Sequence, residues 1–119
     1  MSSAAAASVA AVLRVCALFV AAGVLEIGGG WLVWGYVREG RPAWWAALGG
    51  AALVGYGFVA TAQTTVRDFA RLDAAYGGVF ICLSFLWGRA VDGLKLDLGD
   101  LLGGMLSVAG AAVVLAWPR

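Results

Sequence analysis

The residue whose chemistry stands out in this sequence is Glu26, a carboxylic acid at the middle of the apolar run formed by residues 15–37. A helix rises about 1.5 Å per residue and crosses a hydrocarbon core of about 30 Å in about 20 residues, so this run fits one crossing with Glu26 near the midplane. A charged side chain at that depth costs roughly 2.5–3.5 kcal/mol on insertion scales, and such acids usually face a partner helix or a wet cavity. We therefore predict that Glu26 binds a proton or a cation.

Small side chains are expected on both sides of Glu26. At about 100° per residue, its face of the helix also holds Phe19, Ala22, Gly23, Gly29, Gly30 and Val33. Such a face lets another helix approach closely or leaves volume for a guest, and we assign Gly23 and Gly30 to a candidate substrate pocket. The structural alternative is that Glu26 stays protonated and hydrogen-bonds a neighbouring polar group, for which the candidates are Gln63, Ser84 and Ser107.

A second set of candidate pocket residues recurs at helical spacing around the apolar run 74–90. It consists of Asp73, Tyr76 and Phe80. Aromatic rings attract cations through their electron-rich faces, so this set could hold an organic cation. An aromatic stripe is also compatible with ordinary helix packing.

Four apolar runs, separated by short charged segments, must position these residues. They are residues 15–37, 43–62, 74–90 and 101–117. The 119-residue chain is 63% hydrophobic and 13% charged, more apolar than a soluble domain of this size can bury. We predict an all-α polytopic membrane protein, a single domain over residues 1–119, with four transmembrane helices in an up-down-up-down order. The apolar start of the chain is interpreted as part of a retained first span, because the run is longer than the apolar region of a signal peptide.

The positive charges do not choose an orientation in the membrane. This order places on one side Arg14, Arg67, Arg71 and Arg119, and on the other side Arg38, Arg41, Arg89 and Lys95. Orientation normally follows an excess of Lys and Arg on the cytoplasmic side. Either a single charge or the amino terminus decides it, or the chain inserts both ways and forms an antiparallel homodimer, which we favour.

The last run carries a face almost without side chains, on which Gly103, Ser107 and Gly110 are candidate dimer-packing residues. Small residues let helix backbones approach closely in lipid. Packing inside one copy of the chain explains the pattern equally well.

Composition excludes several classes of function. The chain has no histidine, Cys16 and Cys82 lie in apolar runs, and the net charge is +1. We therefore expect no metal site, no cofactor and no nucleic-acid partner. An enzyme is not expected either, because no nucleophile–base pair is evident and the glycines at 28–30 lie inside a span, where a phosphate loop would lack water.

Three sequence segments resemble the YnfA family of small bacterial inner-membrane proteins. They are the Ala-Ala-Tyr-Gly-Gly-Val segment at 74–79 followed by Trp87, the Val-Asp-Gly-x-Lys-Leu segment at 91–96, and the Leu-Glu-Ile-x-Gly segment at 25–29. The resemblance implies a four-helix protein of the bacterial cytoplasmic (inner) membrane. It also implies similarity to the small multidrug resistance transporters of the drug/metabolite transporter superfamily, antiparallel dual-topology dimers that exchange protons for cations.

By position, the resemblance carries several functional residues onto this chain. Glu26 matches the essential acid of those transporters, and Tyr76 falls where they place a tryptophan that stacks on substrate. Asp73 stands where they have a tyrosine, which changes the cation accepted or indicates a shifted alignment. Gly103 and Gly110 resemble the seven-spaced glycines on their dimerising helix.

The function expected from these features is a proton-coupled export of small organic cations by a homodimer in the lipid bilayer, with Glu26 as the shared proton and cation site. One alternative is a narrow channel built on the same dual-topology dimer. Another is a structural or accessory subunit of a larger membrane protein, in which Glu26 forms an interhelical hydrogen bond.

Overall fold

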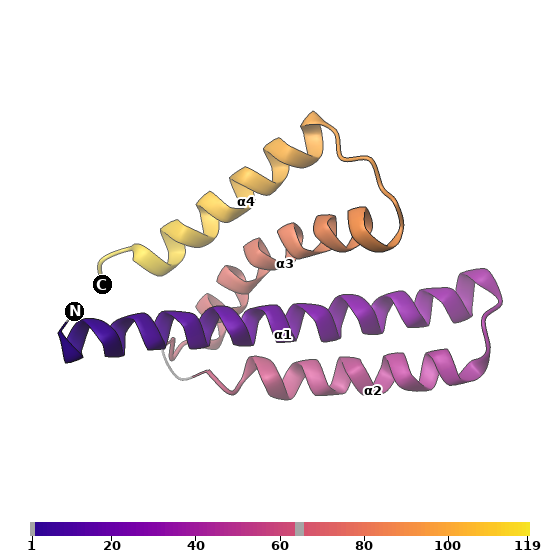
Figure 1. Ribbon diagram of the computed structural model, residues 1–119, viewed down its shortest axis with the longest axis horizontal. Coiled ribbons are helices and arrows are strands. Elements are labelled where there is room, and N and C mark those ends of the chain that lie inside the picture. The colour runs from indigo at the N-terminus through magenta and orange to yellow at the C-terminus, as the bar shows by residue number, and fades with distance from the viewer. Residues whose placement is uncertain (1, 64–65) are drawn as a thin grey trace. The chain divides into compact units, whose positions relative to one another are not determined.

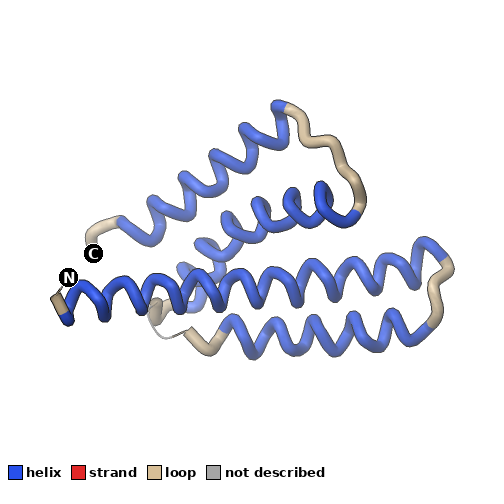
Figure 2. Tube along the Cα trace, viewed as in Figure 1, coloured by secondary structure: helices blue, strands red, loops and turns tan. Residues whose placement is uncertain are grey.

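The computed structural model describes residues 2–63 and 66–119, and all regular secondary structure in these ranges is α-helical (Figure 2). The helices are α1 (Ser3–Glu39), α2 (Ala43–Ala60), α3 (Phe69–Val91) and α4 (Leu98–Ala116). Each of these helices is long and apolar enough to cross a membrane. The prediction of an all-α chain with four candidate spans is confirmed for the described residues.

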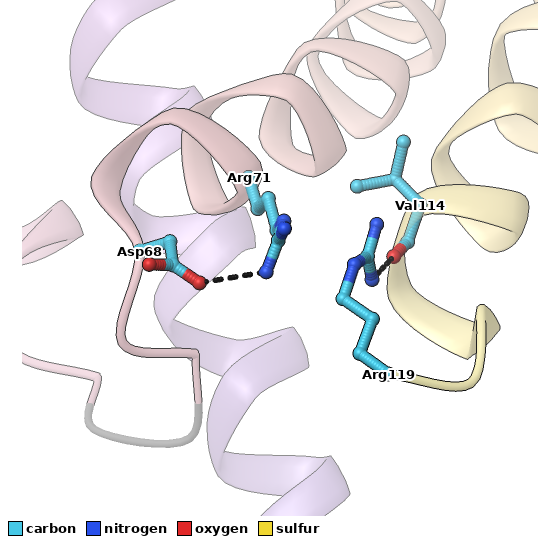
Figure 3. Close-up of polar contacts among 4 residues, drawn as sticks. All are labelled: Asp68, Arg71, Val114 and Arg119. Carbon is cyan, nitrogen blue, oxygen red and sulfur yellow. Dashed lines mark hydrogen bonds and ion pairs between the residues drawn. The ribbon is translucent and has the colours of Figure 1, made fainter.

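Two of the helices extend well beyond the apolar runs that predicted them. α1 begins at Ser3, twelve residues before the run at 15–37, because Ser2 caps it and alanines follow: the Ser2 hydroxyl accepts a hydrogen bond from the Ala5 N–H at 3.1 Å. α3 begins at Phe69, where Arg71 donates to the Asp68 carboxylate at 2.9 Å (Figure 3). Charged residues at helix ends therefore lie inside the helices rather than in the connections.

The chain divides into two compact units, an N-terminal hairpin of α1 and α2 and a C-terminal hairpin of α3 and α4 (Figure 1). Within each hairpin the two helices run antiparallel. Large apolar side chains cover both units, including Phe58 at 75% and Leu106 at 74% exposure. Such a surface suits hydrocarbon rather than water.

The N-terminal hairpin is closed by a glycine contact. If Gly29 on α1 carried a Cβ, that atom would lie 2.8 Å from the Gly49 carbonyl oxygen on α2, and a Cβ on Gly49 would lie 2.6 Å from the Gly29 oxygen. Real Cβ atoms do not approach so closely, so the two backbones pass at a distance that only glycine permits.

The C-terminal hairpin has a comparable contact with glycine on one side only. A Cβ on Gly78 of α3 would lie 2.6 Å from the Ser107 carbonyl oxygen and 2.7 Å from the Ala111 Cβ, both on α4. α4 starts with a capping box in which Asp97 and Asp100 each accept the other's backbone N–H, at 2.9 and 3.0 Å. At its other end, Arg119 donates to the Val114 carbonyl at 2.9 Å (Figure 3).

The first helix of each hairpin ends in the same way. Gly40 and Gly93 follow α1 and α3 with φ values of 69° and 68°, in the left-handed region that favours glycine. The next residue then donates its N–H to an earlier glycine carbonyl, Arg41 to Gly35 at 3.1 Å and Leu94 to Gly88 at 2.9 Å. These turns end the first helix of each hairpin.

Candidate functional site

Glu26 lies on α1 one turn before the glycine contact with α2, and its side chain is half-buried. On the preceding turns of the same face, Phe19, Ala22 and Gly23 are buried. Glu26 therefore lies between buried residues along α1, in a position that suits an acid in a membrane span.

The two glycines that follow Glu26 on its face have different surroundings. Gly29 is buried, and the space of its missing side chain is filled by Gly49, Leu53 and Ala52 of α2. Gly30 is exposed, and apart from the backbone of its own helix turn no heavy atom of the described residues lies within 4 Å of the position its Cβ would take. The sequence predicted that the small residues beside Glu26 allow either a close helix contact or free volume. Gly29 makes a close contact with α2, and the space beside Gly30 is open.

The second set of predicted pocket residues lies on α3. Tyr76 is buried at 6% exposure, and its ring centroid lies 6.1 Å from that of Phe80 with the planes tilted by 44°. Asp73 is exposed near the start of the helix. Tyr76 and Phe80 thus form an aromatic pair one helical turn apart, with the carboxyl of Asp73 one turn before Tyr76.

The candidate pocket draws its residues from both hairpins. Glu26, Gly23 and Gly30 belong to the N-terminal hairpin, whereas Asp73, Tyr76 and Phe80 belong to the C-terminal one. Each set is formed within its own hairpin, and their union in one pocket remains a prediction.

The predicted dimer-packing face of α4 is divided between two environments. The Ser107 carbonyl meets Gly78 of α3, and the Ser107 hydroxyl donates to the Gly103 carbonyl at 2.8 Å. Gly103 and Gly110 are exposed, and a Cβ on either would have no heavy atom within 4 Å among the described residues. These two glycines are therefore available to another helix, and association of two copies through them stays a prediction.

Sequence reasoning missed two features. One is a pair of arginine–tryptophan stacks at the α1–α2 turn, for which the signal was the four-residue spacing of Trp34 with Arg38 and of Arg41 with Trp45. The other is an open apolar groove of about 540 Å³ between α3 and α4, where the Cys82 thiol donates to the Gly104 carbonyl at 3.8 Å. The small side chains that open this groove lie on α4, next to the glycines assigned to dimer packing.

Comparison with known proteins identifies the family. Residues 12–119 match the family described as "Uncharacterised BCR, YnfA/UPF0060 family". A UPF0060 membrane protein of Clavibacter sepedonicus is 53% identical over 107 residues, which cover 90% of this chain and 95% of the relative. One from Herpetosiphon aurantiacus is 49% identical over 91% of this chain and 98% of its own length, and one from Streptomyces coelicolor is 51% identical over 91% and 96%.

No solved structure matches the chain. The relatives are bacterial membrane proteins by name, and they match nearly end to end. With its candidate membrane spans, this chain belongs to the YnfA/UPF0060 family of bacterial multi-pass membrane proteins.

Proposed function

We propose that this protein is a proton-coupled exporter of small organic cations, acting as an antiparallel homodimer in the bacterial cytoplasmic membrane. The observation that carries the proposal is the position of Glu26, a half-buried acid within a 37-residue apolar helix, with open volume at Gly30 on the same face. Acids inside membrane spans are rare and mark ion or substrate pathways. The resemblance to small multidrug resistance transporters supports the same assignment.

The mechanism follows from competition at one carboxyl group. The Glu26 carboxylate binds either a proton or an organic cation, because one negative charge in an apolar setting is neutralised by a single positive charge. Proton binding therefore releases the cation, and cation binding releases the proton. Two copies in opposite orientations give the dimer two equivalent openings, so a switch between them exposes the site to each side in turn.

Proton release on cation addition tests the shared site directly. A lipophilic cation, tetraphenylphosphonium, is added to purified protein in weakly buffered detergent solution, and the released protons are measured with a pH dye. We expect release from the wild type and none from Glu26→Gln. Glu39→Gln is the matched control, because Glu39 lies on the same helix but is exposed beside Arg41 at its end.

Other outcomes point to the alternatives. Proton release that survives in Glu26→Gln would contradict the assignment of the site. Cation flux through vesicles without proton movement would favour the channel. Absence of both, with reproducible co-purification of one large membrane protein, would favour an accessory subunit.

The antiparallel dimer has a separate test. After Cys16 and Cys82 are replaced, a single cysteine is introduced at Glu39, which is exposed at the end of α1, and labelled from each side of the membrane. Equal labelling from both sides is expected of a chain that inserts both ways. Labelling from one side alone would reject the antiparallel arrangement while leaving the role of Glu26 open.

A further inference from the structure

Two arginines at the α1–α2 turn lie over tryptophan rings. The Arg38 guanidinium carbon lies 4.8 Å from the Trp34 ring centroid, and that of Arg41 lies 5.1 Å from the Trp45 ring centroid. Trp45 is part of a wider aromatic cluster, with Trp31 at 5.3 Å and Trp44 at 6.0 Å between ring centroids. Attraction between the cations and the ring faces holds both guanidinium groups at this end of the hairpin.

The backbone fixes this arrangement. Gly40 adopts the left-handed conformation, and Arg41 donates its N–H to the Gly35 carbonyl at 3.1 Å. Gly35 leaves room for the ring of Trp45, because a Cβ there would lie 2.8 Å from two ring carbons. The Trp45 ring, over which Arg41 lies, therefore packs directly against Gly35 of α1.

The stacks leave the hydrogen-bonding edges of both arginines available. A guanidinium group that uses its face against a ring keeps its N–H donors in the plane, in the fork that suits a phosphate or carboxylate. Glu39 approaches Arg41 only at the 4.0 Å limit of an ion pair, and both side chains are more than half exposed, at 53% and 55%. With two cations and one carboxylate, the turn carries a net charge of +1.

The turn joins the ends of two candidate spans, and the ends of membrane spans meet the lipid headgroups, where exposed tryptophans such as Trp34 and Trp44 are typical. We propose that Arg38 and Arg41 bind the phosphate of an anionic phospholipid at this turn. A phosphodiester matches the donor fork, and a lipid of net charge −1 matches the turn, whereas a zwitterionic lipid brings an ammonium group of its own. The tryptophan rings then contact the upper part of the acyl chains.

Quenching of tryptophan fluorescence by brominated lipids tests the site in the full chain. The protein is reconstituted in phosphatidylcholine vesicles that contain a minor fraction of brominated lipid, either phosphatidylglycerol or phosphatidylcholine at equal amounts. One net charge near the surface predicts about fivefold enrichment of the anionic lipid around the turn, seen as stronger quenching. We expect this preference to disappear in Arg38→Gln/Arg41→Gln and to persist in Arg89→Gln, an exposed arginine at the end of α3.

Two further experiments test whether the guanidinium groups are required and whether the ligand is a lipid. Arg38→Lys/Arg41→Lys keeps the charge but loses the planar fork, so we expect a reduced preference; a full preference would overturn the role of the stacked guanidinium groups. Excess inorganic phosphate in the buffer should leave the preference intact, and its loss would assign the site to a soluble phosphate instead. Equal quenching by both lipids in the wild type would overturn the proposal, provided that circular dichroism shows the same helix content in every variant.

Discussion

The two hairpins close by glycine, but they do so differently. In the N-terminal hairpin the contact is reciprocal, because Gly29 and Gly49 each receive the other's carbonyl oxygen where a side chain would begin. In the C-terminal hairpin only α3 contributes glycine, and α4 presents the backbone of Ser107 and the methyl of Ala111. Helices in lipid gain little from the hydrophobic effect, so such close contacts carry much of their association. We therefore expect larger side chains at the contact to destabilise the N-terminal hairpin on either helix, at Gly29 or at Gly49.

The largest effect is expected from Gly49→Leu. Its side chain would have to pass the Gly29 carbonyl oxygen, which cannot move without breaking α1, so we expect a loss of about 3 kcal/mol or more of hairpin stability. The measurement is unfolding in mixed micelles followed by circular dichroism. Gly50→Leu is the control, since in the part of the chain that the structure describes nothing beyond its own helix turn lies within 4 Å of its Cβ position. Equal losses in the two variants would disprove the contact.

A smaller loss of stability is expected from Gly78→Ala, and a second substitution, Ala111→Gly, should restore part of it. The added methyl meets both Ser107 and Ala111, and we expect a cost of about 1–3 kcal/mol in the same unfolding experiment. Ala111→Gly in the same chain removes one of the two clashes, so a double-mutant cycle should show favourable coupling between the substitutions.

The control for Gly78→Ala is the same substitution at the neighbouring glycine, Gly77→Ala. Its Cβ position is open, so alanine should stabilise the helix by about 0.5–1 kcal/mol. Independent, additive effects of Gly78→Ala and Ala111→Gly would contradict the one-sided contact.

A still smaller effect is expected at the start of α4. Asp97→Ala removes the acceptor of the Asp100 N–H and should cost about 1 kcal/mol. Pro42, which precedes α2, makes no side-chain capping hydrogen bond, so Pro42→Ala should cost less. Thermal unfolding of both variants measures the difference, and a larger loss for Pro42→Ala would reverse the comparison.

The smallest effect on stability is expected from Gly103→Leu and Gly110→Leu. Both positions are open within the described chain, so unfolding should change by no more than about 0.5 kcal/mol. If two copies associate through this face, the dimer fraction in crosslinking should fall nonetheless. A folded variant that dimerises normally would place the dimer contact elsewhere.

The sequence predicted the helices better than it predicted their contacts. Apolar runs located all the described helices, because length and hydropathy indicate a span, but the bounds predicted for the first span, 15–37, left out the Ser2 cap and the alanine-rich start of α1. Adjacent glycines are the harder problem: Gly29 and Gly49 are packed, whereas their neighbours Gly30 and Gly50 are open. Neighbours on a helix point about 100° apart, so only three-dimensional packing decides which one faces the partner.

In the candidate site, too, residue types were predictable from the sequence and contacts between helices were not. The chemistry of Glu26 and the small residues on its face could be inferred from residue type and spacing. The structure buries Gly23 and Gly29 of that face and leaves Gly30 exposed. The four-residue spacing of Arg38 with Trp34 and of Arg41 with Trp45 signals the two arginine–tryptophan contacts, whereas the contact of Trp45 with Trp31 depends on the turn at Gly40, which brings α2 back to the end of α1. A pattern along one helix does not contain that information.

The length of α1 has a mechanical consequence. Its 37 residues continue past the end of α2 (Figure 1), so its amino-terminal part is a long arm beyond the close contact at Gly29. At about 1.5 Å per residue, a tilt of α1 by about 10° about Gly29 would sweep Ser3 through about 7 Å but shift Glu26 by only about 1 Å. The acid lies close to the helix contact and far from the amino-terminal end of the helix, so a change in helix tilt would displace it little.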